Sequence, residues 1–229
     1  MIKLLIFDLD GTLMDTIQDI TDAVNYAVQP LGIQPFPVDE ITLKVGAGLT
    51  KLIEGVIPAG RSVSPHSKEN EGTNSLRNET LNRFLDYYTE HLLDTTHLYP
   101  QVEETLSRLG NYKKTVLSNK REALTRRALE GTGIAGFFDN VLGSDSVSEK
   151  KPSPVPIFEV MKRFGMSREN TAIIGDSSFD IEAGKKAGIL TIAVTYGYRD
   201  RDILKDADYM IDSFGELLDL LPKINPIHH

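Results

Sequence analysis

The chain has 229 residues, of which 40% are hydrophobic and 25% charged, and its formal net charge is −8. This composition is typical of a soluble globular protein, and the negative charge disfavours nucleic acid or an anionic membrane surface as the main partner. The chain has no cysteine, which excludes disulfides, thiolate nucleophiles and zinc–thiolate sites.

No apolar stretch reaches the length of a membrane span, and the first one, residues 4–7, is too short for a signal peptide. We therefore expect a cytoplasmic protein without a membrane partner. The final two histidines resemble a tag remnant and are left out of any argument about metal binding.

The first strand is predicted over Leu4–Phe7, because a short and fully apolar run is typical of a strand buried on both faces. Two carboxylates, Asp8 and Asp10, follow it directly, and Gly11 then allows an unusual backbone conformation. In an open α/β sheet, ligands bind beyond the carboxyl ends of the strands. Two carboxylates in such a crevice require a cation or a shared proton. The alternative is an Asp-Gly turn after an edge strand.

Residues 14–95 show helical patterns and no strand. Apolar residues recur at helical spacing from Ile17 to Leu31, and an amphipathic stretch over 41–57 is interrupted by Gly46-Ala47-Gly48. This interruption is either a joint between helices or a loop that approaches a ligand. A polar segment, Arg61 to Asn74, is predicted to be an exposed mobile loop, and a helix is predicted over Leu76–Leu93. We expect an inserted all-helical cap over 14–95.

From residue 96 onward, apolar strands alternate with helices. The predicted strands are 115–118, 140–143, 172–175, 190–194 and 209–211, and the predicted helices are 100–109, 122–129, 156–164, 181–187 and 214–221. Such alternation predicts a doubly wound, Rossmann-like parallel sheet. The predicted α/β core thus comprises 1–13 and 96–229.

Further polar residues follow the later strands. Ser118 and Asn119 come after the second strand, where a hydroxyl and an amide can bind a phosphoryl oxygen or simply form a turn and a helix cap. Asp176 ends a strand and Asp180 starts the next helix, either as a helix cap or as part of a site. Combined with the two carboxylates after the first strand, they form an oxygen-rich cluster suited to Mg²⁺.

These segments resemble the haloacid dehalogenase-type phosphohydrolases, and the resemblance covers nearly the whole chain. It implies that Asp8 attacks phosphorus, that Asp10 handles the proton of the leaving group, and that Ser118 binds phosphate. It also implies that Lys151, in Lys150-Lys151-Pro152, neutralises the nucleophile and the phosphate, although surface lysine pairs are usually only solvated. Because Asp10 is present, dehalogenation is disfavoured.

The resemblance further implies the ligands of a Mg²⁺ ion. These are Asp8, the backbone carbonyl of Asp10 and Asp176, with Asp180 binding directly or through water. The oligomeric state cannot be read from the sequence.

The segments 8–16, 45–48, 99–100, 118–120 and 211–213 are similar to those of the phosphoglycolate phosphatase-like branch. Lys51, after the glycine pair of the cap, is a candidate cation for a substrate carboxylate, and the alternative is a solvated helix lysine. The segment 61–74 has no match in this branch, and it falls in the cap, which sets substrate choice in the family.

The sequence therefore predicts a Mg²⁺-dependent phosphomonoesterase that forms an aspartyl-phosphate and acts on a small phosphorylated metabolite, with 2-phosphoglycolate as first candidate. The alternatives are a β-phosphoglucomutase-like phosphomutase, or a phosphatase for sugar phosphates, nucleotides or pyrophosphate. An alternative of another class is a non-catalytic binding or regulatory module, against which the nucleophile and proton donor both argue.

Overall fold

The computed structural model describes residues 1–57 and 69–225, and within 69–74 it describes the backbone only. The chain divides into two compact units, one made of Met1–Asp15 with His97–His229 and the other of Thr16–Thr96. Each unit is described separately below. No helix within the described ranges combines the length and the apolar character that crossing a membrane requires.

The first unit is built on a six-stranded sheet with the strand order β5-β4-β1-β6-β7-β8. All neighbouring strands run parallel. The strands are β1 (Leu4–Phe7), β4 (Lys113–Leu117), β5 (Asn140–Leu142), β6 (Thr171–Gly175), β7 (Leu190–Val194) and β8 (Tyr209–Ile211). The predicted α/β fold with a parallel sheet is confirmed, and β1 lies at its centre between β4 and β6.

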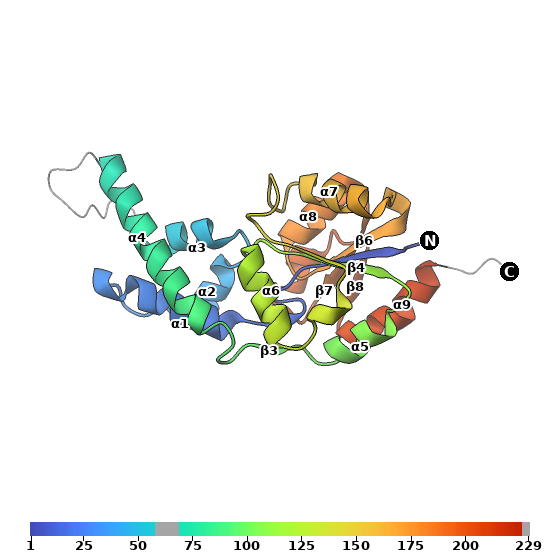
Figure 1. Ribbon diagram of the computed structural model, residues 1–229, viewed down its shortest axis with the longest axis horizontal. Coiled ribbons are helices and arrows are strands. Elements are labelled where there is room, and N and C mark those ends of the chain that lie inside the picture. Colours follow the sequence, from blue (N-terminus) through green and yellow to red (C-terminus); the bar gives the residue numbers. More distant parts are fainter. Residues whose placement is uncertain (58–68, 226–229) are drawn as a thin grey trace. The chain divides into compact units, whose positions relative to one another are not determined.

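Helices cover both faces of this sheet. In Figure 1, α7 and α8 lie on one face, and α5 and α9 lie on the other. The helices of this unit are α5 (Val102–Arg108), α6 (Glu122–Gly131), α7 (Val155–Phe164), α8 (Ser178–Ala187) and α9 (Leu217–Ile224). Short 3₁₀ turns complete it: η2 (Ala135–Phe137), η3 (Arg168–Asn170), η4 (Arg201–Leu204) and η5 (Phe214–Glu216).

The side chains of β1 enter the core on both faces. Leu4 and Ile6 belong to a buried cluster with Ile157 of α7 and other residues of that face. The ring of Phe7 instead lies 5.8 Å from the ring of Phe214, in the turn before α9. Because both faces are covered, all four residues of β1 are buried, which explains why the strand is apolar throughout. Asp8, the residue after β1, therefore follows a strand that is held by packing on both faces.

The second unit is helical. It comprises α1 (Ile17–Val28), η1 (Gln29–Leu31), α2 (Val38–Lys44), α3 (Leu49–Val56) and α4 (Glu69–Glu90). The helical insertion predicted in this part of the chain is confirmed. The glycine pair separates α2 from α3, and both glycines have positive φ, 112° at Gly46 and 89° at Gly48. The interruption is thus a joint between two helices; its approach to a ligand stays a prediction.

Two predictions about the insertion are wrong in detail. Part of the loop predicted over 61–74 is helical, because α4 begins at Glu69, while residues 58–68 lie outside the described residues. A polar sequence allows an exposed helix as well as a loop once a later part of the same helix packs, here through Phe84 and Tyr88. The expectation of no strand over 14–95 is also wrong. β2 (Met14–Asp15) pairs antiparallel with β3 (His97–Leu98), and pairs this short carry no alternating pattern.

Candidate active site

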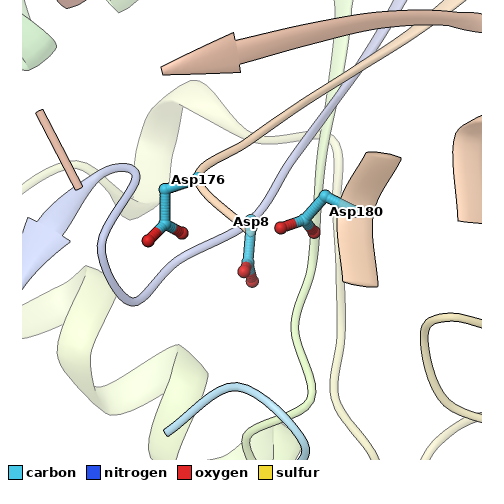
Figure 2. Close-up of side chains that lie close together, drawn as sticks. All are labelled: Asp8, Asp176 and Asp180. Carbon is cyan, nitrogen blue, oxygen red and sulfur yellow. The ribbon is translucent and has the colours of Figure 1, made fainter. Parts of the chain in front are cut away.

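The neighbouring strands β1 and β6 bring two carboxylates together at their carboxyl ends. Asp8 is the first residue after β1, and its backbone N–H donates to the carbonyl of Ile174 over 2.9 Å. Asp176 is the first residue after β6, and Asp180 lies in the first turn of α8. One carboxylate oxygen from each of these three residues lies within 4.8 Å of the others, and Figure 2 shows how they converge.

The start of α8 holds Asp180 in place. The backbone N–H of Ser177 donates to Asp180 Oδ2 over 3.2 Å as part of a capping box, and the hydroxyl of Ser177 donates to the same oxygen over 2.6 Å. The other oxygen, Oδ1, accepts from Lys151 Nζ over 2.6 Å. Asp180 therefore both caps the helix, as one interpretation of the sequence has it, and contributes to the cluster.

Lys151 is the cation of the cluster. Its ammonium lies 2.9 Å from Asp8 Oδ1 and 2.6 Å from Asp180 Oδ1, and its side chain is 1% exposed. Burial acts to lower the pKa of Lys151, but the charges of Asp180 and Asp8 outweigh burial, so the pKa is raised and the ammonium stays charged. The structure thus brings Lys151, rather than Lys150, to the nucleophile candidate.

The pKa values of the two carboxyls at the strand ends are raised well above the usual range. Burial, followed by the charge of Asp180, raises the pKa of Asp8 to about 7, although Lys151 opposes the shift. Burial, followed by the charges of Asp8 and Asp180, raises the pKa of Asp176 to about 8. The surroundings therefore destabilise the ionised form of each of these two carboxyl groups.

The charge balance of the cluster fits a divalent cation. Three carboxylates face one ammonium, so with all three ionised the cluster has an excess of two negative charges. Carboxylate oxygens are hard ligands of the kind that Mg²⁺ and Ca²⁺ prefer. A bound divalent cation would offset that excess and favour the ionised forms of Asp8 and Asp176.

Asp10 lies outside this group of three and has a partner that the sequence does not predict. Its carboxylate is 2.5 Å from Lys120 Nζ, with 13% of the Asp10 side chain and 7% of the Lys120 side chain exposed. Lys120 follows directly on Ser118-Asn119, but no feature of the sequence indicates which carboxylate it contacts. The proton-transfer role of Asp10 and the metal contact of its carbonyl stay predictions.

Ser118 and Asn119 lie directly beyond β4, next to β1 in the sheet. Ser118 is 3% exposed, and its hydroxyl accepts from the backbone N–H of Lys120 over 3.2 Å. The amide of Asn119 contacts the backbone of Lys151 in both directions, donating to its carbonyl over 2.9 Å and accepting from its N–H over 3.1 Å. Asn119 therefore fixes the loop that carries Lys151, a role that the sequence does not indicate.

Lys51 belongs to the helical unit. It lies on α3, its side chain is 65% exposed, and its ammonium pairs with Glu54 over 2.8 Å. Its predicted contact with a substrate stays a prediction.

The chain is similar to proteins of known family. Residues 5–194 match the family described as haloacid dehalogenase-like hydrolase. A phosphoglycolate phosphatase of Neisseria meningitidis is 35% identical over 222 residues, which cover 94% of this chain and 92% of that protein. One of Aquifex aeolicus is 34% identical, with 86% of each chain covered.

Solved structures agree with this similarity. A protein of Haemophilus somnus, called a predicted phosphoglycolate phosphatase, superposes with a TM-score of 0.84 at 28% identity, covering 96% of this chain and 98% of its own. Since both the family match and the relatives extend over most of the sequence, the chain is an enzyme of the haloacid dehalogenase-like hydrolases.

Proposed function

We propose that the protein is a Mg²⁺-dependent phosphomonoesterase that acts through an aspartyl-phosphate on Asp8. The observation that carries the proposal is the position of Asp8. It follows the central strand and lies in an ion pair with the buried Lys151, beside Asp176 and Asp180. A carboxylate in this position can attack phosphorus, and the adjacent ammonium reduces the repulsion between the carboxylate and a phosphate ester.

The first chemical step is transfer of the phosphoryl group to Asp8. A carboxylate oxygen of Asp8 forms a bond to phosphorus while the bond from phosphorus to the ester oxygen breaks. Asp10 donates a proton to the departing alkoxide. The contact with Lys120 fixes the orientation of the Asp10 carboxyl group, which enters this step in its protonated form.

The second step returns the enzyme to its starting state. Asp10 accepts a proton from a water molecule, the oxygen of this water forms a bond to phosphorus, and the bond from phosphorus to Asp8 breaks. Inorganic phosphate and the free carboxylate of Asp8 result.

The remaining residues stabilise charge in both steps. Lys151 faces Asp8, and Ser118 contributes a hydroxyl beyond the adjacent strand. Asp8, Asp176 and the carbonyl of Asp10 would hold the Mg²⁺ ion, with Asp180 binding it directly or through water while it also orients Lys151. When bound, Mg²⁺ neutralises charge on the phosphoryl oxygens.

We propose 2-phosphoglycolate as the substrate and the helical unit as the cap that selects it. The support is the name of the relatives, which are phosphoglycolate phosphatases at about a third identity over most of their length. The cap carries Lys51, a largely exposed cation that could meet a substrate carboxylate.

A panel of phosphate esters tests the proposal. Catalytic efficiency is measured with Mg²⁺ for 2-phosphoglycolate, ethyl phosphate, a hexose phosphate, a nucleotide and an aryl phosphate. We expect the highest value for 2-phosphoglycolate, no activity in excess chelator, recovery with Mg²⁺ and poor replacement by Ca²⁺. Ca²⁺ takes more oxygen ligands at longer distances, which disturbs in-line attack.

The outcomes separate the parts of the proposal. Preference for a hexose phosphate or nucleotide would remove the substrate assignment and leave the phosphatase chemistry. Full activity in excess chelator would contradict the metal site. A phosphoenzyme that transfers its phosphate to a second sugar instead of water would identify a phosphomutase.

A further inference from the structure

Asp176 is held between two loops that come from different strands. The hydroxyl of Thr12, in the loop after β1, donates to Asp176 Oδ1 over 3.2 Å. The backbone N–H of Tyr198, in the loop after β7, donates to Asp176 Oδ2 over 2.8 Å. Each carboxylate oxygen therefore accepts one hydrogen bond from a different side, and the residue is only 2% exposed.

Glycines let both loops come this close. A Cβ at Gly197 would lie 2.3 Å from Asp176 Cβ and 2.4 Å from the carbonyl oxygen of Gly11. A Cβ at Gly11, whose φ is +80°, would lie 2.3 Å from Asp176 Oδ2. Any larger residue at either position forces the Asp176 side chain or a backbone to move.

The two loops are also fastened to each other. The hydroxyl of Tyr196 donates to the carbonyl of Thr12 over 2.8 Å. The ring of Tyr196 packs on the ring of Tyr99, with 4.7 Å between centroids. This contact lies directly beside the position where Gly197 meets Asp176, so the loop after β7 has a fixed position.

We infer that Thr12 and Gly197 are positioning residues that fix the Asp176 carboxylate for a divalent cation. The Thr12 hydroxyl and the Tyr198 N–H, which Gly197 allows to come close, each occupy one side of one oxygen and leave the remaining lone pairs in a defined direction. A carboxylate whose rotamer is already fixed loses less conformational freedom when it binds an ion. This inference rests on the proposed Mg²⁺ site, and it concerns binding of the ion rather than the chemistry.

Unfolding temperature measured at increasing Mg²⁺ concentration tests the inference on the metal-depleted full chain. An ion that binds only the folded state raises this temperature according to its affinity. We expect Thr12→Val and Gly197→Ala to weaken Mg²⁺ binding by about 10- to 100-fold, the usual effect of removing a residue that orients a metal ligand.

Matched variants separate positioning from general damage. Thr12→Ser keeps the hydroxyl and should bind Mg²⁺ as the wild type does. Gly110→Ala adds a Cβ with nothing within 4 Å, and Thr115→Val removes a buried hydroxyl that donates to the carbonyl of Asn140 in the same sheet. Both should leave Mg²⁺ affinity unchanged, whatever they do to the unfolding temperature in chelator.

The possible results of this experiment lead to different conclusions. If the wild type binds Mg²⁺ and Thr12→Val binds it equally well, the inference is overturned and the proposed function stands. If the wild type shows no Mg²⁺-dependent stabilisation, the metal site and the inference both fail. Should Gly197→Ala not fold, the comparison of Thr12→Val with Thr12→Ser decides alone.

Discussion

At the scale of single residues, the buried charges of the site determine what each side chain can do. Lys151 is the only cation that the described residues place in contact with both Asp8 and Asp180. Removing it leaves two carboxylates without their counter-ion in a buried position, which is costly. One lysine therefore supports both the folded state and the proposed reaction.

Replacement of Lys151 by alanine should reduce catalytic efficiency by roughly 10²-fold or more, because a stabiliser of the transition-state charge is lost. It should also lower the free energy of unfolding by about 3–5 kcal/mol in chelator, as expected for a broken buried ion pair. Lys150→Ala is the matched control. Kinetics and urea unfolding of both variants check this, and equal effects of the two substitutions would contradict the assignment.

The raised pKa values of Asp8 and Asp176 predict how stability depends on pH. The unperturbed pKa of both carboxyls is near 3.8, whereas the pKa in the folded state is about 7 for Asp8 and about 8 for Asp176. Between these pH values the folded state therefore binds more protons than the unfolded state. Stability of the metal-free protein should therefore fall as pH rises from about 4 to about 8.

The difference between wild type and Asp176→Asn isolates this effect, because the amide does not titrate. We expect urea unfolding in chelator to show the wild type losing stability relative to the variant over this range. A difference that stays constant or has the opposite sign would show that the pKa of Asp176 is not raised.

The residues of the site differ in how far the sequence predicts them. Asp8 and Asp176 could be predicted to meet, because each follows an apolar strand and parallel strands end at one edge. The contact of Lys120 with Asp10 could not, since a flexible lysine reaches any of several carboxylates. The Tyr198 donor to Asp176 is a backbone N–H, which has no signature in the sequence at all.

At the scale of elements, one buried carboxylate ties together the two ends of the helical unit. Asp19, in the first turn of α1, is 2% exposed. It accepts hydrogen bonds from the backbone N–H and the hydroxyl of both Thr95 and Thr96, which end the same unit. These bonds to a charged acceptor join the first helix of the unit to its last residues.

Asp19→Ala should therefore destabilise the protein by about 2–4 kcal/mol, because it leaves several buried donors without an acceptor. Asp22→Ala is the control. Asp22 lies on the same helix, is exposed, and accepts a hydrogen bond from the side-chain amide of Gln18 over 2.9 Å. Urea unfolding followed by circular dichroism measures the difference, and similar stabilities of the two variants would count against this role of Asp19.

Element boundaries were predictable where an apolar pattern marks them. Strands such as Leu190–Val194 carry enough buried residues to be recognised from the sequence alone. The start of α4 at Glu69 was not, because its first residues are polar and their helical state depends on packing further along. β2 and β3 depend on each other across more than eighty residues, so neither is visible locally.

At the scale of the whole molecule, our proposal assigns the chemistry to the core unit and substrate choice to the helical unit. If Lys51 contacts a substrate carboxylate, catalytic efficiency should be far lower for ethyl phosphate than for 2-phosphoglycolate. Lys51→Ala should reduce this difference in catalytic efficiency. Lys44→Ala is a control, since Lys44 is also a cation of the helical unit that pairs with a glutamate. If the difference in catalytic efficiency is unchanged in Lys51→Ala, Lys51 does not contribute to substrate binding.

The overall architecture could be predicted because alternating strands and helices leave few ways to build a sheet. The substrate could not be predicted with the same force, because Lys51, the side chain proposed to recognise it, contacts Glu54 in the structure. Family membership indicates the class of reaction but not the substrate, because one fold hosts enzymes for many substrates.

The central claim is that phosphate passes through Asp8, and the Asp10→Asn variant tests it most directly. An aryl phosphate has a leaving group that departs without a proton, so this variant should still form the aspartyl-phosphate but hydrolyse it slowly. With Mg²⁺ and 4-nitrophenyl phosphate, we predict a burst of nitrophenolate equal to the enzyme concentration and, after acid quench, phosphate on the peptide that contains Asp8. Phosphate on another residue, or turnover without a burst and with Asp8 unlabelled, would contradict the account.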